Sequence, residues 1–228
     1  MGVVQEALEA LGHPHGALPE PRLLANLFVR FQAQVPLRRL PEGSGPEEAL
    51  ASWLEDGAGC CGESRARAFA ALALAAGFSI EEARARGPAG ESHQVLLAHD
   101  RRILLDPAFP LPAPLSLDPP AEAESTGYGA LSVRSGGPKR FEVLLETRGD
   151  ERVLYQVEPG EESSSGDRGR ETVREAGPGQ LFRLLEDRLL RWRSGTLEVS
   201  DAWSRLHVPF PASDPEGLEA LFGPPIPE

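Results

Sequence analysis

Helical and strand-like patterns occupy different parts of this 228-residue chain, and this segregation restricts the fold more than any other feature. Apolar residues recur with helical spacing up to about residue 78, and Gly77 is well placed to end the last helix. The alternation typical of strands begins only at His93. A doubly wound α/β sheet would instead alternate the two patterns along the chain. The sequence therefore predicts an α+β fold.

The expected elements follow from spacing and from the glycines and prolines that separate them. The predicted helices cover residues 4–11, 23–31, Glu47–Leu54 and Ser64–Ala76. The predicted hairpins pair His93–Ala98 with Arg102–Asp106 and Phe141–Thr147 with Arg152–Val157. Glu158–Gly179 is poor in apolar residues and predicts a mobile loop, and an amphipathic helix is expected over Gln180–Trp192, followed by an irregular tail.

These elements predict three parts. Residues 1–78 form a helical domain that carries the nucleophile proposed below, and residues 79–160 form a β-rich domain that carries its histidine and aspartate. Residues 161–228 hold the loop, the last helix and a C-terminal lid or tail.

Charge and composition exclude several classes of partner. The formal net charge is −12, so a nucleic acid would be repelled, and no basic run offers a local exception. No apolar run approaches the length of a bilayer span, and residues 1–11 lack the positive charge of a signal peptide. The two cysteines, Cys60 and Cys61, are adjacent, which disfavours a disulfide between them. We therefore expect a cytoplasmic protein with no membrane or nucleic-acid partner. No sequence feature specifies an oligomeric state.

Cys61 is the strongest candidate for a catalytic residue. It follows a Gly-Ala-Gly-Cys turn and directly precedes a predicted helix. Unpaired amides and the partial positive charge at a helix N-terminus favour a thiolate, and the same amides can stabilise an oxyanion. Small residues, including Gly59, allow a sharp turn and a close approach of substrate.

His93 and Asp106 are the candidates for its partners. His93 opens the first strand of a predicted hairpin and Asp106 closes the second. Because the strands run antiparallel, these two ends are neighbours in space, so the carboxylate can fix the tautomer of the imidazole. A cysteine at a helix start that faces a His–Asp pair is the arrangement of papain-like folds. The sequence therefore predicts a Cys61–His93–Asp106 triad.

Simpler interpretations of each residue remain open. A single cysteine is most often a small buried apolar residue, His93 could be a polar residue at a strand edge, and Asp106 precedes a proline as many turn residues do. A metal site built from Cys60, Cys61, His93 and His99 is a further alternative. Adjacent cysteines lack the usual C-x-x-C ligand spacing, so we expect no metal.

Several segments resemble motifs of the arylamine N-acetyltransferase family, in the same order. Gly57–Glu63 resembles the family's Arg-Gly-Gly-Tyr-Cys-Phe-Glu motif, with Cys61 at the nucleophile. His93–Leu97 is similar to its His-Leu-Leu-Leu-Val run, and Asp106–Pro110 to its Asp-Val-Gly-Phe-Gly. Leu154–Pro159 and the terminal Leu-Phe-Gly resemble its last motifs. The chain departs from the family at Gly57, which replaces the motif's arginine, and at prolines that follow Asp106.

The resemblance implies a papain-like core with an N-terminal helical bundle, a central antiparallel β-barrel or sheet region, and a C-terminal helix and tail. It implies transfer of an acetyl or other acyl group from acetyl-CoA or another acyl-CoA to an arylamine, hydrazine or related amine by a ping-pong route. Phe109 would line the acceptor pocket, and Glu63 would be a buried structural acid. Arg38, Arg39 or Arg65 would offset the negative charge of CoA.

Two other functions use the same residues. A transglutaminase-like or peptidase-like hydrolase has the same Cys-His-Asp order and would turn over a glutamine-containing or peptide substrate without CoA. A degenerate, non-catalytic family member would carry a Cys61 that reacts slowly with iodoacetamide. An amide synthase that closes a polyketide chain is a further variant of the acyltransferase hypothesis.

Overall fold

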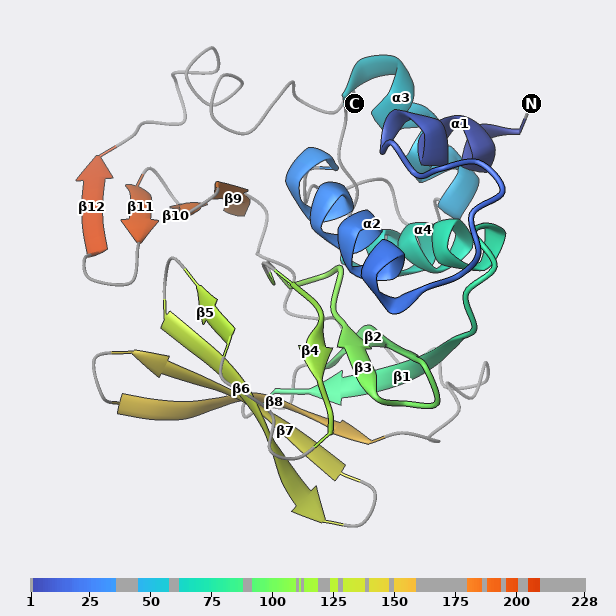
Figure 1. The fold of residues 1–228 in the computed structure, drawn as a ribbon. Helices are drawn as coiled ribbons and strands as arrows, with labels where there is room; N and C mark the ends of the chain where they lie inside the picture. Colours follow the sequence, from blue (N-terminus) through green and yellow to red (C-terminus); the bar gives the residue numbers. More distant parts are fainter. Residues whose placement is uncertain are drawn as a thin grey trace.

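Four helices precede all the strands in the part of the chain that the structure describes (Figure 1). The structure is a computed structural model, and it describes residues 2–35, 45–57, 62–87, 92–109, 111, 113–118, 124–126, 129–137, 140–147, 150–158, 180–185, 188–193, 196–200 and 205–209. The helices are α1 (Val3–Ala10), α2 (Pro21–Gln34), α3 (Pro46–Asp56) and α4 (Gly62–Ala75). Helices α2 and α3 each begin with a proline, which suits the first helical position because its missing N–H has no partner there. All four predicted helices are confirmed.

Aromatic rings pack α2 against α4. Phe69 of α4 is fully buried and meets two rings of α2 edge-on, Phe28 at 5.4 Å and Phe31 at 5.2 Å between centroids. Such pairs add to the stabilisation from burial itself, because the positive ring edge faces the negative ring face. The position of α4, the helix that follows Cys61, is thus set by a rigid apolar contact. No helix in the described ranges is long and apolar enough to cross a membrane.

An eight-stranded antiparallel sheet lies beside the helices, with the order β4-β3-β2-β1-β8-β7-β6-β5 (Figure 1). Its strands are β1 (Ile80–Arg86), β2 (Ser92–Ala98), β3 (Ile103–Leu105), β4 (Leu115–Ser116), β5 (Glu124–Thr126), β6 (Gly129–Gly137), β7 (Arg140–Thr147) and β8 (Asp150–Glu158). The pairs β2–β3 and β7–β8 are the two predicted hairpins, and both are confirmed. Strand β4 also approaches β6, so the sheet curls toward a barrel. Helix α4 packs on β2 and β1. The α+β prediction is confirmed.

The prediction of a helix over Gln180–Trp192 is wrong. This segment forms two strands, β9 (Gln180–Leu185) and β10 (Arg188–Arg193), which pair in register from Leu185 opposite Arg188 to Gln180 opposite Arg193. Strands β11 (Thr196–Ser200) and β12 (Arg205–Pro209), in the expected irregular tail, complete a four-stranded antiparallel sheet. Pairing between neighbouring strands satisfies the backbone N–H and C=O groups that a helix would satisfy internally. Strand pairing therefore overrides the helical spacing of the apolar residues in this segment. The predicted mobile loop lies outside the described residues, except for Glu158 at the end of β8.

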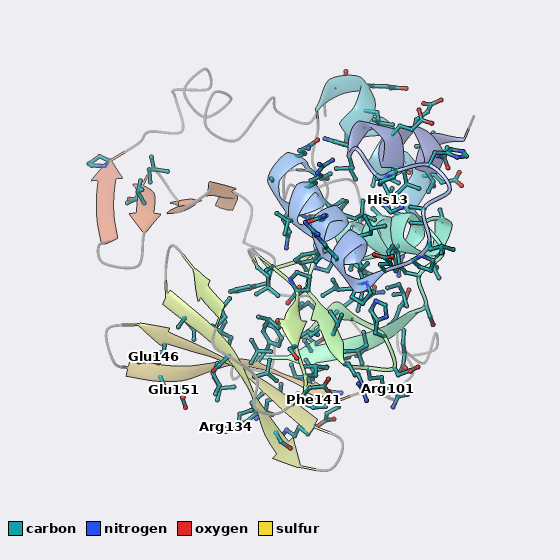
Figure 2. The ribbon with its side chains drawn as sticks, in the orientation of Figure 1. His13, Arg101, Arg134, Phe141, Glu146 and Glu151 are labelled. Carbon is teal, nitrogen blue, oxygen red and sulfur yellow. The ribbon has the colours of Figure 1, made fainter. Side chains whose placement is uncertain are left out.

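Charged side chains cover the far end of the eight-stranded sheet. Arg134 of β6 pairs with Glu142 at 2.8 Å and with Glu151 at 3.1 Å, and Figure 2 shows Arg134 and Glu151 on the side of the sheet away from the helices. The hydrogen bond from Arg134 lowers the pKa of the Glu142 carboxyl. Exposed pairs of this kind are screened by salt and contribute little to stability. The surface around Arg134 at this end of the sheet is therefore exposed to solvent.

Candidate active site

Strands β2 and β3 bring His93 and Asp106 into contact. His93 is the second residue of β2, and Asp106 directly follows β3. The His93 Nε2 atom lies 2.7 Å from Asp106 Oδ2, and the Asp106 side chain is fully buried while that of His93 is 15% exposed. The antiparallel hairpin thus produces the His–Asp contact expected from the sequence.

The Asp106 carboxylate is oriented by the loop that follows it. Its Oδ1 atom accepts the backbone N–H groups of Ala108 at 3.1 Å and Phe109 at 2.9 Å. One carboxylate oxygen is therefore held by the loop and the other by the imidazole. A buried carboxylate requires such partners, because desolvation without hydrogen bonds is strongly unfavourable.

The imidazole of His93 is held on a second side by Tyr155. The Tyr155 ring, from β8, meets the His93 ring edge-on with a centroid distance of 5.0 Å and an interplanar angle of 87°. Because a carboxylate can only accept, Nε2 of His93 carries the proton that faces Asp106. The other ring nitrogen, Nδ1, is then the one that can take a proton from a substrate or from a thiol.

Phe109 lies in the same cluster. Its ring is partly buried and lies 6.1 Å from the Tyr155 ring, edge-on. Its backbone is fixed on both sides, since the N–H donates to Asp106 Oδ1 and the carbonyl accepts from Gln32 Nε2 at 2.8 Å. A partly exposed aromatic ring on a rigid backbone is a suitable wall for an apolar or aromatic ligand.

Cys61 and Gly59 lie outside the described residues, so the position of the predicted nucleophile stays a prediction. The structure describes both flanks of that segment. Helix α3 ends at Asp56 and is capped by Gly57, whose φ of 67° and ψ of 12° are left-handed and whose N–H donates to the Trp53 carbonyl at 2.9 Å. Helix α4 begins at Gly62, the residue after Cys61, and packs against β2, the strand that carries His93.

The left-handed conformation explains why glycine stands at position 57. Among the described residues, apart from its chain neighbours, a Cβ atom there would meet no atom within 4 Å, and the left-handed backbone conformation itself disfavours a larger residue. We expect Gly57→Ala to lower the free energy of unfolding by about 1 kcal/mol, since a side chain is strained in this region. Urea unfolding of the two proteins measures the difference. Gly57→Asn should lose less, because asparagine tolerates the left-handed region better than alanine. Equal losses for the two substitutions would contradict this explanation.

Two sequence predictions about charged residues near Cys61 are wrong. Glu63 is not a buried acid: its side chain is 61% exposed and pairs at 2.5 Å with Arg67, one helical turn further along α4. Arg65 does not lie on the surface where it could meet CoA, because it is only 3% exposed. The helix turns 100° per residue, and in α4 this places Arg65 on the face that packs against α2. Arg38 and Arg39 lie outside the described residues.

His93 and His99, two ligands of the alternative metal site, are too far apart to bind one metal ion. His93 and His99 lie at opposite ends of β2, about 20 Å apart at roughly 3.3 Å per residue. His99 instead meets the Phe78 ring edge-on at 6.3 Å, and His13 meets the same ring at 6.3 Å, on the helical side of the molecule (Figure 2). Partial burial lowers the pKa of His13, because desolvation disfavours the charged imidazolium. Among the described residues, no group of three or more candidate ligands gathers around one point.

Gln32 is a part of the site that the sequence interpretation missed. It is 9% exposed and hydrogen-bonds with the Asp106 loop and with Arg65. A signal was present, since Gln32 lies four residues after Phe28 on the apolar face of α2. A polar residue on a buried face needs partners, so it marks a candidate site.

No protein-family model matches this sequence, and no curated protein matches it either. Solved structures do match over nearly the whole chain. The arylamine N-acetyltransferase of Mycobacterium abscessus superposes with a TM-score of 0.80 at 14% identity, covering 98% of this chain and 90% of its own. The chain has the arylamine N-acetyltransferase fold. The predicted family resemblance is therefore confirmed at the level of the fold.

Two further structures with this fold add chemical information about those proteins. The Mycobacterium marinum arylamine N-acetyltransferase, solved in complex with CoA, matches with a TM-score of 0.70 at 15% identity, covering 96% of this chain and 92% of its own. The Bacillus cereus enzyme, described as having a Cys-His-Glu catalytic triad, matches with a TM-score of 0.69 at 13% identity, covering 99% of this chain and 100% of its own. At these identities the arylamine N-acetyltransferase fold is established, and activity has to be argued from the site.

Proposed function

We propose that this protein is an acyltransferase that moves an acetyl or other acyl group from acyl-CoA to an arylamine, hydrazine or related amine through an acyl-cysteine on Cys61. The buried His93–Asp106 pair, with its 2.7 Å contact, is the observation that carries the proposal. Such a pair is what a cysteine nucleophile needs, because the histidine takes the thiol proton and the carboxylate orients the histidine. His93 lies on β2, the strand that packs against α4, and α4 is the helix that Cys61 precedes.

In the first half-reaction, Nδ1 of His93 removes the proton from Cys61 and the thiolate attacks the thioester carbonyl. A new sulfur–carbon bond forms, the bond between the acyl carbon and the CoA sulfur breaks, and the imidazolium returns its proton to the CoA thiolate. Amides at the start of α4 are suited to stabilise the tetrahedral oxyanion, because the first N–H groups of a helix have no helical partner.

In the second half-reaction, an amine attacks the acyl-cysteine. His93 takes a proton from the amine nitrogen, the nitrogen–carbon bond forms, and the cysteine leaves as a thiolate. Phe109 would bind the acceptor, because its partly buried ring adjoins the His93–Tyr155 pair. A flat aromatic acceptor matches an aromatic wall better than a flexible aliphatic amine does.

Two neighbours with the same fold support the donor and the triad. CoA binds the Mycobacterium marinum protein, and we propose that a CoA thioester is the donor here as well. The Bacillus cereus protein completes its triad with a glutamate, whereas this chain presents Asp106 to the histidine.

The acyl-cysteine can be detected directly. Purified protein mixed with acetyl-CoA should gain about 42 Da, the mass of one acetyl group replacing a hydrogen, in an intact mass spectrum. Cys61→Ala should remove the adduct and Cys60→Ser should keep it, because only one of the two neighbouring thiols is activated. Adding an arylamine or hydrazine should discharge the adduct.

The alternatives predict different results from the same protein. A hydrolase of the transglutaminase or peptidase type would form no adduct with any acyl-CoA but would turn over a glutamine-containing or peptide substrate. A non-catalytic member would form no adduct, and its Cys61 would alkylate no faster than a free thiol. Either result would overturn the acyltransferase proposal.

A further inference from the structure

A buried arginine lies one turn into the helix that follows Cys61. Arg65 is 3% exposed, and its guanidinium carbon lies 5.1 Å from the centre of the Phe31 ring on α2. Its NH2 group donates to the side-chain oxygen of Gln32 at 2.5 Å. Arginine is among the residues least often buried, because removing its charge from water is unfavourable unless specific partners compensate.

Gln32 connects this arginine to the loop that holds the catalytic aspartate. Its Nε2 atom donates to the carbonyl of Asp106 at 3.0 Å and to the carbonyl of Phe109 at 2.8 Å. The orientation of the amide is determined by its partners, since an arginine can only donate and a carbonyl can only accept. One side chain of α2 therefore binds α4 on one side and the Asp106–Phe109 loop on the other, across sequence separations of 33 and 74 residues.

We propose that Gln32 and Arg65 are positioning residues that hold the first turn of α4, and with it Cys61, in register with Asp106 and His93. The proposal rests on the acyl-cysteine function proposed above. Apolar contacts such as Phe69 on Phe28 hold α4 against α2, but they do not connect α4 to the Asp106–Phe109 loop, which Gln32 does. The three hydrogen bonds of the Gln32 amide, one accepted from Arg65 and two donated to the Asp106–Phe109 loop, are directional and fix the distance between α4 and that loop.

The catalytic requirement for such a link is strict. Proton transfer from Cys61 to His93 needs heavy-atom contact at hydrogen-bond distance, and a displacement of about 1 Å can lower a catalytic rate by about 10²-fold. Cys61 and His93 come from different elements, 32 residues apart in the sequence. Gln32 and Arg65 form a short polar connection from α4, the helix that Cys61 precedes, to the loop that begins with Asp106, the partner of His93.

A purely structural role predicts a different outcome from a positioning role. Replacing a buried charged group and its partner by apolar residues of similar size often leaves stability unchanged or increased. If the pair only stabilised the fold, Arg65→Met and Gln32→Met would have one of two results. The variant would fold and keep the full reactivity of the Cys61 thiol, or it would not fold at all. A positioning role instead predicts variants that are folded but have a poorly activated thiol.

The test measures the reactivity of Cys61 with iodoacetamide as a function of pH, in a Cys60→Ser background where Cys61 is the only thiol. With the pair intact, the alkylation rate should reach half its maximum below about pH 8.5, the pKa of a free cysteine thiol. Arg65→Met and Gln32→Met should slow alkylation at neutral pH by about tenfold or more and move the midpoint toward that of a free thiol. Circular dichroism and thermal melting should show that the variants remain folded.

Arg67→Met is the matched control, because Arg67 is on the same helix, is 51% exposed and pairs only with the exposed Glu63 among the contacts of described residues. Its alkylation profile should equal that of the parent protein. Arg65→Lys should restore part of the rate, since it keeps the charge but loses the planar geometry. If Arg65→Met does not fold, Arg65→Lys and Gln32→Glu decide in its place, because Gln32→Glu keeps the acceptor for Arg65 and removes the donor to the loop.

A parent-like pH profile in the folded Arg65→Met and Gln32→Met variants would overturn the positioning role. This failure is distinct from failure of the proposed function. A protein that alkylates rapidly in the way described but forms no acetyl adduct would overturn acyl transfer and leave the positioning role supported.

Discussion

Asp106→Asn should lower kcat/KM for acyl transfer by about 10²- to 10⁴-fold while leaving the protein folded. The substitution is nearly isosteric. The asparagine oxygen can still accept the N–H groups of Ala108 and Phe109, which now bond to Oδ1. Its NH2 group, however, faces Nε2 of His93 and forces that nitrogen to accept. The proton of the neutral imidazole then moves to Nδ1, which in the proposed reaction has to accept the thiol proton, so this nitrogen can no longer act as the base.

Steady-state kinetics with acetyl-CoA and an arylamine measure this loss. Asp118→Asn is the matched control, because the Asp118 side chain is 59% exposed and lies 3.9 Å from Arg102 on the surface. That variant should keep the kcat/KM of the wild type. If Asp106→Asn retained more than about a tenth of wild-type kcat/KM, the carboxylate would not be setting the tautomer of His93.

Phe69→Ala should lower the free energy of unfolding by about 3–5 kcal/mol. Phe69 has no exposed surface, and it meets Phe28 and Phe31 edge-on, so the substitution removes both buried area and two aromatic contacts. The rigid neighbours on α2 can collapse only partly into the space, so the loss should be large for a buried residue. Because the free energy of unfolding of a whole domain is about 5–15 kcal/mol, this substitution should remove a large fraction of it.

Urea unfolding followed by circular dichroism measures this change, with the slope of the transition checking that the same surface is exposed. Leu74→Ala on the same helix is the control: Leu74 is 58% exposed, and its loss should stay within about 0.5 kcal/mol. A loss of less than about 1.5 kcal/mol at Phe69 would mean that α2 and α4 are not rigidly packed there.

The contact between His93 and Asp106 was predictable because the interaction that creates it is local. Alternating apolar residues predicted two strands, and a turn of a few residues between them forces the pairing to be antiparallel. The ends of such a hairpin meet whatever the rest of the chain does. In the observed register Leu96 lies opposite Leu105, so Asp106 follows on beside Val95, and His93 is two residues further along the same face of β2.

The surroundings of Cys61 were predicted less well. Arg65 and Glu63 lie two residues apart in a helix of good helix formers, and their sequence does not tell which of them faces α2. In the structure the buried Arg65 donates a hydrogen bond to Gln32, whereas the exposed Glu63 forms an ion pair with Arg67. Which of the two is buried depends on how α4 is rotated about its axis against α2. That rotation is set by residues of α2, about thirty positions earlier in the chain.

The C-terminal part shows the same limit for secondary structure. The spacing of leucines in Gln180–Trp192 fits a helix as well as two short strands, and the pairing of β9 with β10 and of β10 with β11 resolves the ambiguity. What the sequence alone determined was the local content of the protein: four helices, two hairpins, the α+β class, and the meeting of His93 with Asp106. The tertiary structure decided the Gln32–Arg65 link and the second sheet. The Gln32–Arg65 link joins residues 33 positions apart, so it depends on how α4 packs against α2. The second sheet pairs consecutive strands, but its apolar spacing also fits a helix, so only the pairing itself distinguishes the two.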